Sequence, residues 1–318
     1  MFSEHLEHLN DRRFRAVVGA LLAVLAVASP ASGGRAAAKS YVRVSFVRIG
    51  RLPAVTSRAC AVALSDGRVL VAGGLIGGSS SDQILTGPPR RLRPVGHLPT
   101  PTHDAAAARF EGGIGVFGGG QSASTDSVTV IDPRTGSARV AGRLDEPLSD
   151  LAAVTVGART YLVGGYTGTR FASAVLRVGR RLTTTTVARL PTGLRYAGVT
   201  SLGGTIYVAG GLTTAGESTT VYAVDPVRGR VRRIGRLPVP VAHAPLVAVG
   251  KALYLIGGVG ASGSATRELF RIDPHSGQTM QAARLPVALA DAAAVASGHV
   301  AIVVGGGTRD VYRLTLRS

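Results

Sequence analysis

Six polar residues recur along the chain at intervals of 46, 46, 46, 47 and 48 residues. They are Arg58, Asp104, Asp150, Tyr196, His243 and Asp291, and each is followed by an apolar residue. His103 and Arg195 stand one place before two of them. Aspartates with a histidine could bind a cation or the hydroxyl groups of a sugar, and an arginine could meet a carboxylate. Alternatively, each aspartate bonds backbone N–H groups at a junction between elements, with Arg58 as counter-ion.

A second candidate for chemistry is the motif G-x-G-x-x-G at Gly258, Gly260 and Gly263, directly after an apolar run. In a dinucleotide-binding unit such glycines open a helix, and an acidic residue follows about 20 residues later. Here the next segment, residues 264–277 (SATRELFRIDPHSG), has no helical period and ends in an Asp-Pro turn. We therefore expect no cofactor at this motif.

The elements that must position these residues form an internal repeat. Apolar runs end in paired glycines whose first members lie 45, 46, 46, 47 and 48 residues apart. These pairs are Gly73-Gly74, Gly118-Gly119, Gly164-Gly165, Gly210-Gly211, Gly257-Gly258 and Gly305-Gly306. A second marker keeps the same register, namely Leu52-Pro53, Leu98-Pro99, Leu144-Asp145, Leu190-Pro191, Leu237-Pro238 and Leu285-Pro286. The G-x-G-x-x-G motif is thus the fifth glycine pair followed by a Gly/Ser loop.

Each repeat divides into four short strands, and the turns Asp-Pro-x-x-Gly join the third strand to the fourth. Four-stranded units of 40–50 residues predict an all-β, six-bladed β-propeller with one sheet per blade around a channel. The last repeat ends after its third strand, so residues 41–50 should supply the missing outer strand and close the ring. By symmetry the six polar residues should form one ring near a mouth of the channel.

These markers resemble the kelch-repeat family, which includes the galactose-oxidase-type propellers. The glycine pairs, the Leu-Pro markers and a Tyr shortly before three pairs (Tyr161, Tyr207 and Tyr254) match its pattern over residues 41–318. The family's usual Trp and the Arg that often follows Leu-Pro are absent. The resemblance implies a six-bladed propeller of an exported bacterial protein. It admits binding scaffolds, sialic acid mutarotases and copper-dependent galactose oxidases, and we expect no metal here.

The N-terminal segment differs from the repeats. Arg12, Arg13 and Arg15 precede an apolar run, Ala16–Ala28, which is too short for the roughly 20 residues of a spanning helix but suits a signal peptide. We assign residues 1–28 to a signal peptide or an N-terminal membrane anchor, 29–40 to a linker and 41–318 to the propeller. The protein is then expected to be exported and to reside in an extracellular, periplasmic or cell-envelope location.

The net charge is +18, and arginines gather in the expected fourth strands as an outer belt. Such a charge favours loose contact with anionic envelope polymers that salt would weaken, although a GC-rich coding sequence also explains an arginine excess. The basic runs are not interleaved with aromatics, so nucleic acid is not an expected partner. Cys60 is the single cysteine, which excludes an internal disulfide.

We therefore expect a non-catalytic binding scaffold at the cell envelope. Its partner would be a protein or a saccharide at the channel mouth, and contact with a membrane would come only from the N-terminal anchor. The alternative is a carbohydrate-modifying enzyme similar to the sialic acid mutarotases that acts at the polar ring.

Overall fold

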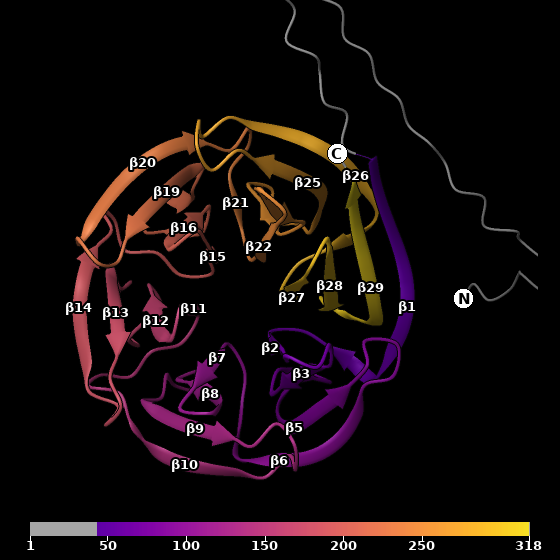
Figure 1. Ribbon diagram of the computed structural model, residues 1–318, viewed down its shortest axis with the longest axis vertical. Coiled ribbons are helices and arrows are strands. Elements are labelled where there is room, and N and C mark those ends of the chain that lie inside the picture. Colours follow the sequence, from indigo (N-terminus) through magenta and orange to yellow (C-terminus); the bar gives the residue numbers. More distant parts are fainter. Residues whose placement is uncertain (1–42, 318) are drawn as a thin grey trace, which may run out of the picture. The chain divides into compact units, whose positions relative to one another are not determined.

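The computed structural model describes residues 43–317, and the assignments to residues 1–28 and 29–40 lie outside this range. All regular elements in it are β-strands, arranged as six antiparallel sheets around a central axis (Figure 1). This confirms the predicted six-bladed propeller. The described range contains no helix long and apolar enough to cross a bilayer.

Each blade has four main strands, which follow one another from the channel outward. The first blade contains β2 (Cys60–Ala63), β3 (Val69–Ala72), β5 (Ser79–Gly87) and β6 (Arg93–Thr102), with β4 (Leu75–Ile76) paired to β5. The second contains β7 (Ala106–Phe110), β8 (Gly113–Phe117), β9 (Ser127–Ile131) and β10 (Ala138–Arg143). The third contains β11 (Ala152–Val156), β12 (Arg159–Val163), β13 (Ala174–Val178) and β14 (Thr184–Arg189).

The remaining three blades repeat this order. The fourth contains β15 (Gly198–Leu202), β16 (Thr205–Ala209), β19 (Thr220–Asp225) and β20 (Arg230–Arg236), with the small hairpin β17 (Leu212–Thr213) and β18 (Gly216–Glu217). The fifth contains β22 (Leu246–Val249), β23 (Ala252–Ile256), β25 (Thr266–Ile272) and β26 (Thr279–Leu289), with β21 (Val241–Ala242) paired to β24 (Val259–Gly260). The sixth contains β27 (Ala292–Ser297), β28 (Val300–Gly305), β29 (Thr308–Arg317) and β1 (Arg43–Thr56).

The sixth blade joins the two ends of the described chain. β1 runs antiparallel to β29, with Val44 opposite Leu316 and Phe46 opposite Leu314 (Figure 1). The Phe46 ring also stacks on Tyr312, with centroids 4.5 Å apart. The predicted closure by the N-terminal strand is therefore confirmed, and β29 is not left as an open sheet edge.

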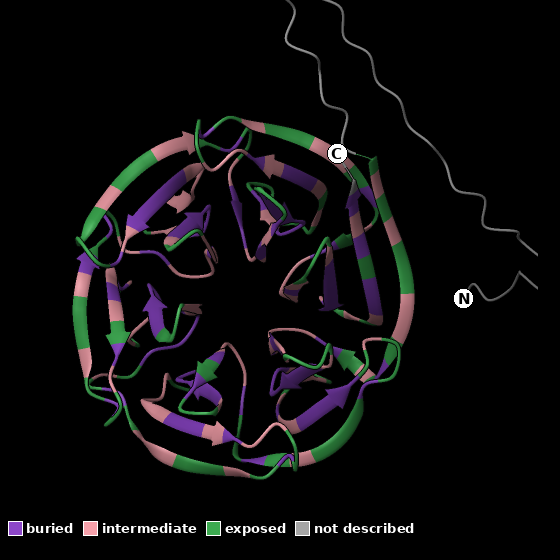
Figure 2. Cartoon of the chain, in the orientation of Figure 1, coloured by how far each residue is buried: buried purple, intermediate pink, exposed green. Residues whose placement is uncertain are grey.

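The core lies between neighbouring blades. All five residues of β23 are buried, whereas the outer strand β20 is largely exposed or half-buried (Figure 2). The strands nearest the channel carry small residues, such as Ala106 and Ala108 of β7. Facing sheets bury their apolar side chains against each other, and this packing between neighbouring blades fixes the positions of the residues that line the channel.

The paired glycines are needed because two blades meet at this point. Gly73 and Gly74 have φ values of +66° and +101°, and the Gly74 N–H donates at 2.8 Å to the carbonyl of Thr102, the last residue of β6 before the chain enters the second blade. A Cβ on Gly73 would lie 2.6 Å from that same carbonyl oxygen. In the fifth blade the G-x-G-x-x-G motif leads into β25 and not into a helix, as the repeat predicted.

Candidate functional site

The six recurring polar residues, called the ring residues below, are joined into a closed cycle through their backbones. The N–H of each donates to the carbonyl of the ring residue in the preceding blade, over 2.9–3.1 Å. The six bonds run from Arg58 to Asp291, Asp104 to Arg58, Asp150 to Asp104, Tyr196 to Asp150, His243 to Tyr196 and Asp291 to His243. The cycle places all six at one mouth of the channel, which we call the ring end.

Every ring residue adopts the left-handed backbone conformation, with φ between +54° and +57°. Asp and His tolerate this region better than most residues, whereas it is unusual for a bulky residue such as Tyr196. A non-glycine residue held there costs of order 1–3 kcal/mol. The blade-to-blade bonds maintain the conformation. Because these bonds use the backbone polar groups, the side chains are left to interact at the channel mouth.

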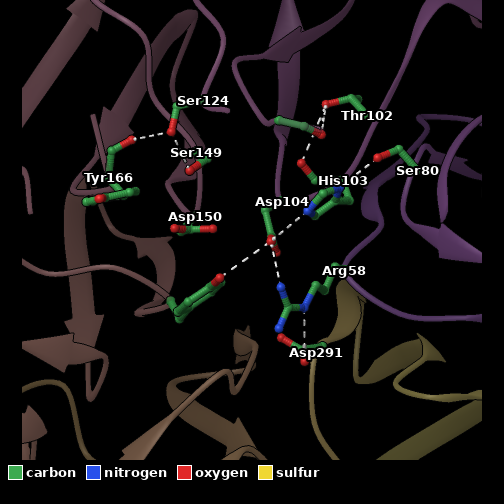
Figure 3. A network of polar contacts seen from close by, with 12 residues as sticks. Arg58, Ser80, Thr102, His103, Asp104, Ser124, Ser149, Asp150, Tyr166 and Asp291 are labelled. Carbon is green, nitrogen blue, oxygen red and sulfur yellow. Dashed lines mark hydrogen bonds and ion pairs between the residues drawn. The ribbon is translucent and has the colours of Figure 1, made fainter. Parts of the chain in front are cut away.

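Arg58 connects two of the ring aspartates. Its Nη1 donates to Asp104 Oδ2 at 3.1 Å, and its Nε lies 3.5 Å from Asp291 Oδ2 (Figure 3). The other oxygen of Asp291 is 2.5 Å from His243 Nδ1. His103 approaches the same group from outside the ring, with Nε2 3.7 Å from Asp104 Oδ2. The first, second, fifth and sixth blades thus share one charged network.

Arg195 occupies an aromatic cage on the other side of the ring. Its guanidinium carbon lies 4.6 Å from the ring centroid of Tyr166, 5.4 Å from Phe171 and 4.7 Å from Tyr196, within the range of cation–π attraction. Its Nη2 is 2.5 Å from Asp150 Oδ2, and the Asp150 side chain is only 2% exposed. The cage and the ion pair together fix Arg195 beside the channel.

Tyr196 links the two halves of the ring. Its hydroxyl accepts from Arg195 Nη2 at 3.0 Å and faces Asp104 Oδ2 at 3.4 Å, while its aromatic ring stacks on His243 with centroids 3.7 Å apart. All eight residues singled out in the sequence, His103 and Arg195 included, are therefore brought together at the ring end. No hydrogen bond within residues 43–317 joins a ring side chain to the backbone, whereas Arg58 is the counter-ion of Asp104 and Asp291, as the structural alternative expected.

The carboxyl groups of the ring have different protonation behaviour. Burial, reinforced by the charge of Asp150, raises the pKa of Asp104 to about 7 even though Arg58 opposes the shift. Burial also acts to raise the pKa of Asp291, but the hydrogen bond and charge of His243 outweigh it and hold this pKa below its usual value. A carboxyl group that is partly protonated near neutral pH can both donate and accept a proton.

The basic and phenolic groups of the site are shifted as well. Burial acts to lower the pKa of Arg58, but the carboxylates of Asp104 and Asp291 raise it by more. Burial, followed by the charge of Arg58, lowers the pKa of His103, and burial raises the pKa of Tyr196. At neutral pH the site therefore holds a charged arginine and an intact phenol next to the protonatable Asp104.

A further layer of polar residues was not found from the sequence. Ser80 Oγ lies 2.8 Å from His103 Nδ1, and Ser124 Oγ lies 2.9 Å from Ser149 Oγ (Figure 3). Ser124 also donates to the carbonyl oxygen of Tyr166 at 3.2 Å. Ser80 lies at the start of β5 and Ser124 in the loop before β9, in segments of different length after the glycine pairs, so the repeat supplies no common register that would have revealed them.

The ring carboxylates are paired with Arg58, Arg195 and His243. Within residues 43–317 no group of three or more His, Cys, Asp or Glu side chains is placed to hold a metal ion. Asp150 Oδ2 has its ion pair with Arg195 Nη2 as its partner. Arg195 Nε is buried and has no hydrogen-bond partner in the described part of the chain, which is uncommon in folded proteins.

Comparison with known proteins agrees with this architecture. The family model for the kelch motif matches residues 193–238, which span the fourth repeat. Among 915 matching chains of solved structures is the structure of YjhT, with a TM-score of 0.73 and 14% sequence identity over 84% of this chain and 99% of that one. No curated protein matches the sequence. The fourth repeat thus matches the kelch motif, and the chain folds as a six-bladed β-propeller whose last blade is closed by its N-terminal strand.

Proposed function

We propose that this propeller is a non-catalytic binding protein that holds a polar ligand, a saccharide or a polar segment of a protein, at the ring end. The observation that carries the proposal is the convergence of polar side chains from all six blades onto one mouth of the channel. The backbone N–H and C=O groups of these residues bond to one another, which leaves the side chains for a ligand. Charged and hydrogen-bonding groups of this kind orient a polar ligand by direct bonds.

The exposed side chains of the ring end indicate which groups a ligand would meet. Arg58, Asp291 and His103 keep side-chain exposures of 30%, 20% and 18%, so they can form further hydrogen bonds. Tyr166 and Phe171 lie beside Arg195 and meet edge to face, with centroids 5.8 Å apart. A sugar offers hydroxyl groups that both donate and accept, as well as C–H faces that pack on aromatic rings. We therefore favour a saccharide over a protein segment.

A thermal-shift experiment on the full chain tests this proposal. The panel consists of neutral hexoses, hexuronates and N-acetylneuraminate, and a ligand at about 100 times its Kd should stabilise the fold by roughly 2.7 kcal/mol. The shift should be lost in the Asp104→Asn, Asp291→Asn variant. It should persist in the Asp225→Asn, Asp273→Asn variant, which removes two carboxylates from turns between third and fourth strands, at the opposite end of the blades. A shift that survives the ring substitutions would place the ligand elsewhere.

The raised pKa of Asp104 favours a second candidate, a carbohydrate-modifying enzyme similar to the sialic acid mutarotases. Interconversion of sugar anomers needs one group that removes the proton of the anomeric hydroxyl and another that protonates the ring oxygen as its bond to the anomeric carbon breaks. Asp104 is suited to either role. Proton NMR of freshly dissolved anomers would distinguish the two functions, because only an enzyme accelerates their equilibration and only an enzyme loses that rate on Asp104→Asn substitution.

Export remains part of the proposal and rests on Arg12, Arg13, Arg15 and the apolar run that follows them. We place the protein at or beyond the cell envelope. Fractionation of expressing cells, with N-terminal sequencing of the recovered chain, tests this directly. A start near residue 29 in an extracytoplasmic fraction supports a cleaved signal, the intact N-terminus in the membrane fraction supports an anchor, and recovery only from the cytosol contradicts export.

A further inference from the structure

The opposite mouth of the channel carries a separate cluster of arginines. The first strand of each blade starts at the ring end, so the turns that follow it lie at the other end, which we call the hairpin end. Two neighbouring pockets open there, with volumes of about 670 Å³ and 340 Å³. The larger is lined by Arg68, Arg109, Arg134 and Arg180, and the smaller by Arg159, Arg177 and Arg228.

The two pockets lie on either side of the third blade. Thr160 and Val178 line the larger pocket, and their neighbours Arg159 and Arg177 line the smaller one. Thr160 pairs with Val178 across β12 and β13. Successive side chains of a strand point to opposite faces of a sheet, so this edge of the blade presents arginines to the smaller pocket and Thr160 and Val178 to the larger one. A ligand that crosses the edge of the third blade would contact both.

Most of these guanidinium groups are available to a ligand. Arg68 Nε is bonded to Asp66 at 2.7 Å, and Arg228 Nη1 is bonded to Asp225 at 3.0 Å. Arg134 only approaches Asp132, at 3.8 Å, with its side chain 85% exposed. The other four, Arg109, Arg159, Arg177 and Arg180, form no ion pair with a carboxylate in the part of the chain that the structure describes, although Arg109 Nη2 donates to the carbonyl of Ala63 at 3.2 Å.

The charge and shape of this surface fit an extended anion. Seven arginines line the two pockets, together with the carboxylates of Asp66 and Glu111, while Asp132 and Asp225 stand beside Arg134 and Arg228, so arginines remain in excess. A guanidinium binds planar oxyanions through two parallel hydrogen bonds, and several of them in a row select a ligand with repeated negative groups. The lining also supplies hydroxyls such as Ser65 and Thr155, which can bond to the hydroxyls of a sugar.

The same surface is poorly suited to nucleic acid. Proteins that bind single strands stack the bases on exposed aromatic rings. The two pockets contain one aromatic residue, Phe110, and it is buried at 7% exposure. We propose that the hairpin end binds an acidic oligosaccharide whose repeated carboxylates bridge the two arginine pockets across the third blade. This site is separate from the ring and does not depend on the function proposed there.

Calorimetric titration of the full chain with hexagalacturonate in 0.15 M salt tests the proposal. We expect saturable binding that is tighter than that of trigalacturonate, because only the longer chain can occupy both pockets, and no binding of a neutral galactose oligomer. The Arg134→Gln, Arg180→Gln variant and the Arg159→Gln, Arg177→Gln variant should each bind at least about tenfold more weakly.

The matched control is Arg232→Gln, Arg233→Gln, which removes two exposed charges from the outer strand β20. It should change affinity by less than about twofold, and all variants should keep the melting temperature of the wild type. An equal loss of affinity in this control would show that hexagalacturonate binds to the outer belt of arginines as a whole and not to a defined site. Absence of hexagalacturonate binding, or tighter binding of a single-stranded oligonucleotide of the same charge, would overturn the proposal.

Discussion

Arg58 and Asp104 are joined twice, once through their backbones and once through their side chains. The N–H of Asp104 donates to the carbonyl of Arg58 at 3.1 Å, and the Arg58 guanidinium donates to the Asp104 carboxylate, also at 3.1 Å. The backbone bond is one of six that close the ring, whereas the ion pair is specific to these two blades. Side-chain substitutions can therefore probe the ion pair while the backbone cycle remains.

The first prediction concerns the strength of this ion pair. Arg58→Met should destabilise the fold more in the wild type than in an Asp104→Asn background, because it leaves a mostly buried carboxylate without its counter-ion. Urea unfolding of the four members of the cycle should give a coupling of about 0.5–3 kcal/mol. Additive effects would mean that Arg58 stabilises the site mainly through Asp291.

The second prediction follows from the raised pKa of Asp104, about 7 in the folded protein. The unfolded chain releases this proton near pH 4, so between about pH 4 and 7 the folded state binds one proton more than the unfolded state. The stabilising contribution is complete below pH 4 and is lost as the pH rises through 7. The lowered pKa of Asp291 acts in the opposite direction, but only in more acidic solution.

Asp104→Asn removes this dependence on pH. The free energy of unfolding of the wild type should fall relative to that of the variant by about 2 kcal/mol between pH 5 and pH 8. Urea titrations of both proteins at the two values measure the difference. Parallel curves across this interval would show that Asp104 titrates at its ordinary value in the folded state.

The blade count and the position of the ring could be predicted because both depend on local signals that recur in register. The glycine pairs occur where the chain needs positive φ, and the Leu of each Leu-Pro marker enters the core, as Leu52 does at 1% exposure. Each repeat therefore reveals the same contact between neighbouring blades, and the spacing of about 46 residues places the polar position identically in each.

The pairing within the ring could not be predicted in the same way. Arg58 bridges Asp104 and Asp291, whereas Arg195 bonds to Asp150 inside an aromatic cage. The two arginines occupy adjacent positions of the repeat, so the sequence alone does not distinguish their roles. Which partner each one selects depends on side-chain directions across the channel and on the loop that carries Tyr166 and Phe171. Neither follows the repeat, so only the folded structure reveals the network.

The third prediction tests the requirement for paired glycines. Gly73→Ala should destabilise the fold by at least about 2 kcal/mol, because the new Cβ would lie 2.6 Å from the Thr102 carbonyl oxygen in addition to the cost of positive φ. Gly67→Ala is the matched control, since Gly67 also has a positive φ but nothing lies within 4 Å of the added carbon. It should cost only about 1 kcal/mol. Equal losses in denaturant unfolding would assign the whole effect to backbone conformation.

The fourth prediction concerns closure of the propeller. Leu52 lies in β1, is 1% exposed and packs in one hydrophobic cluster with Val71 of the first blade and Val311 of the sixth. Leu52→Ala should therefore loosen the junction at which the two ends of the ring meet and cost about 2–5 kcal/mol. Val55→Ala on the same strand is the control, because Val55 is 52% exposed and its truncation should change stability by less than about 0.5 kcal/mol.

Hydrogen exchange locates the loosened part of the propeller. In the Leu52→Ala variant, the amides of β29, which pairs with β1, should exchange faster than those of a central strand such as β12. If protection were lost uniformly, the propeller would open as one cooperative unit and not from its closing blade.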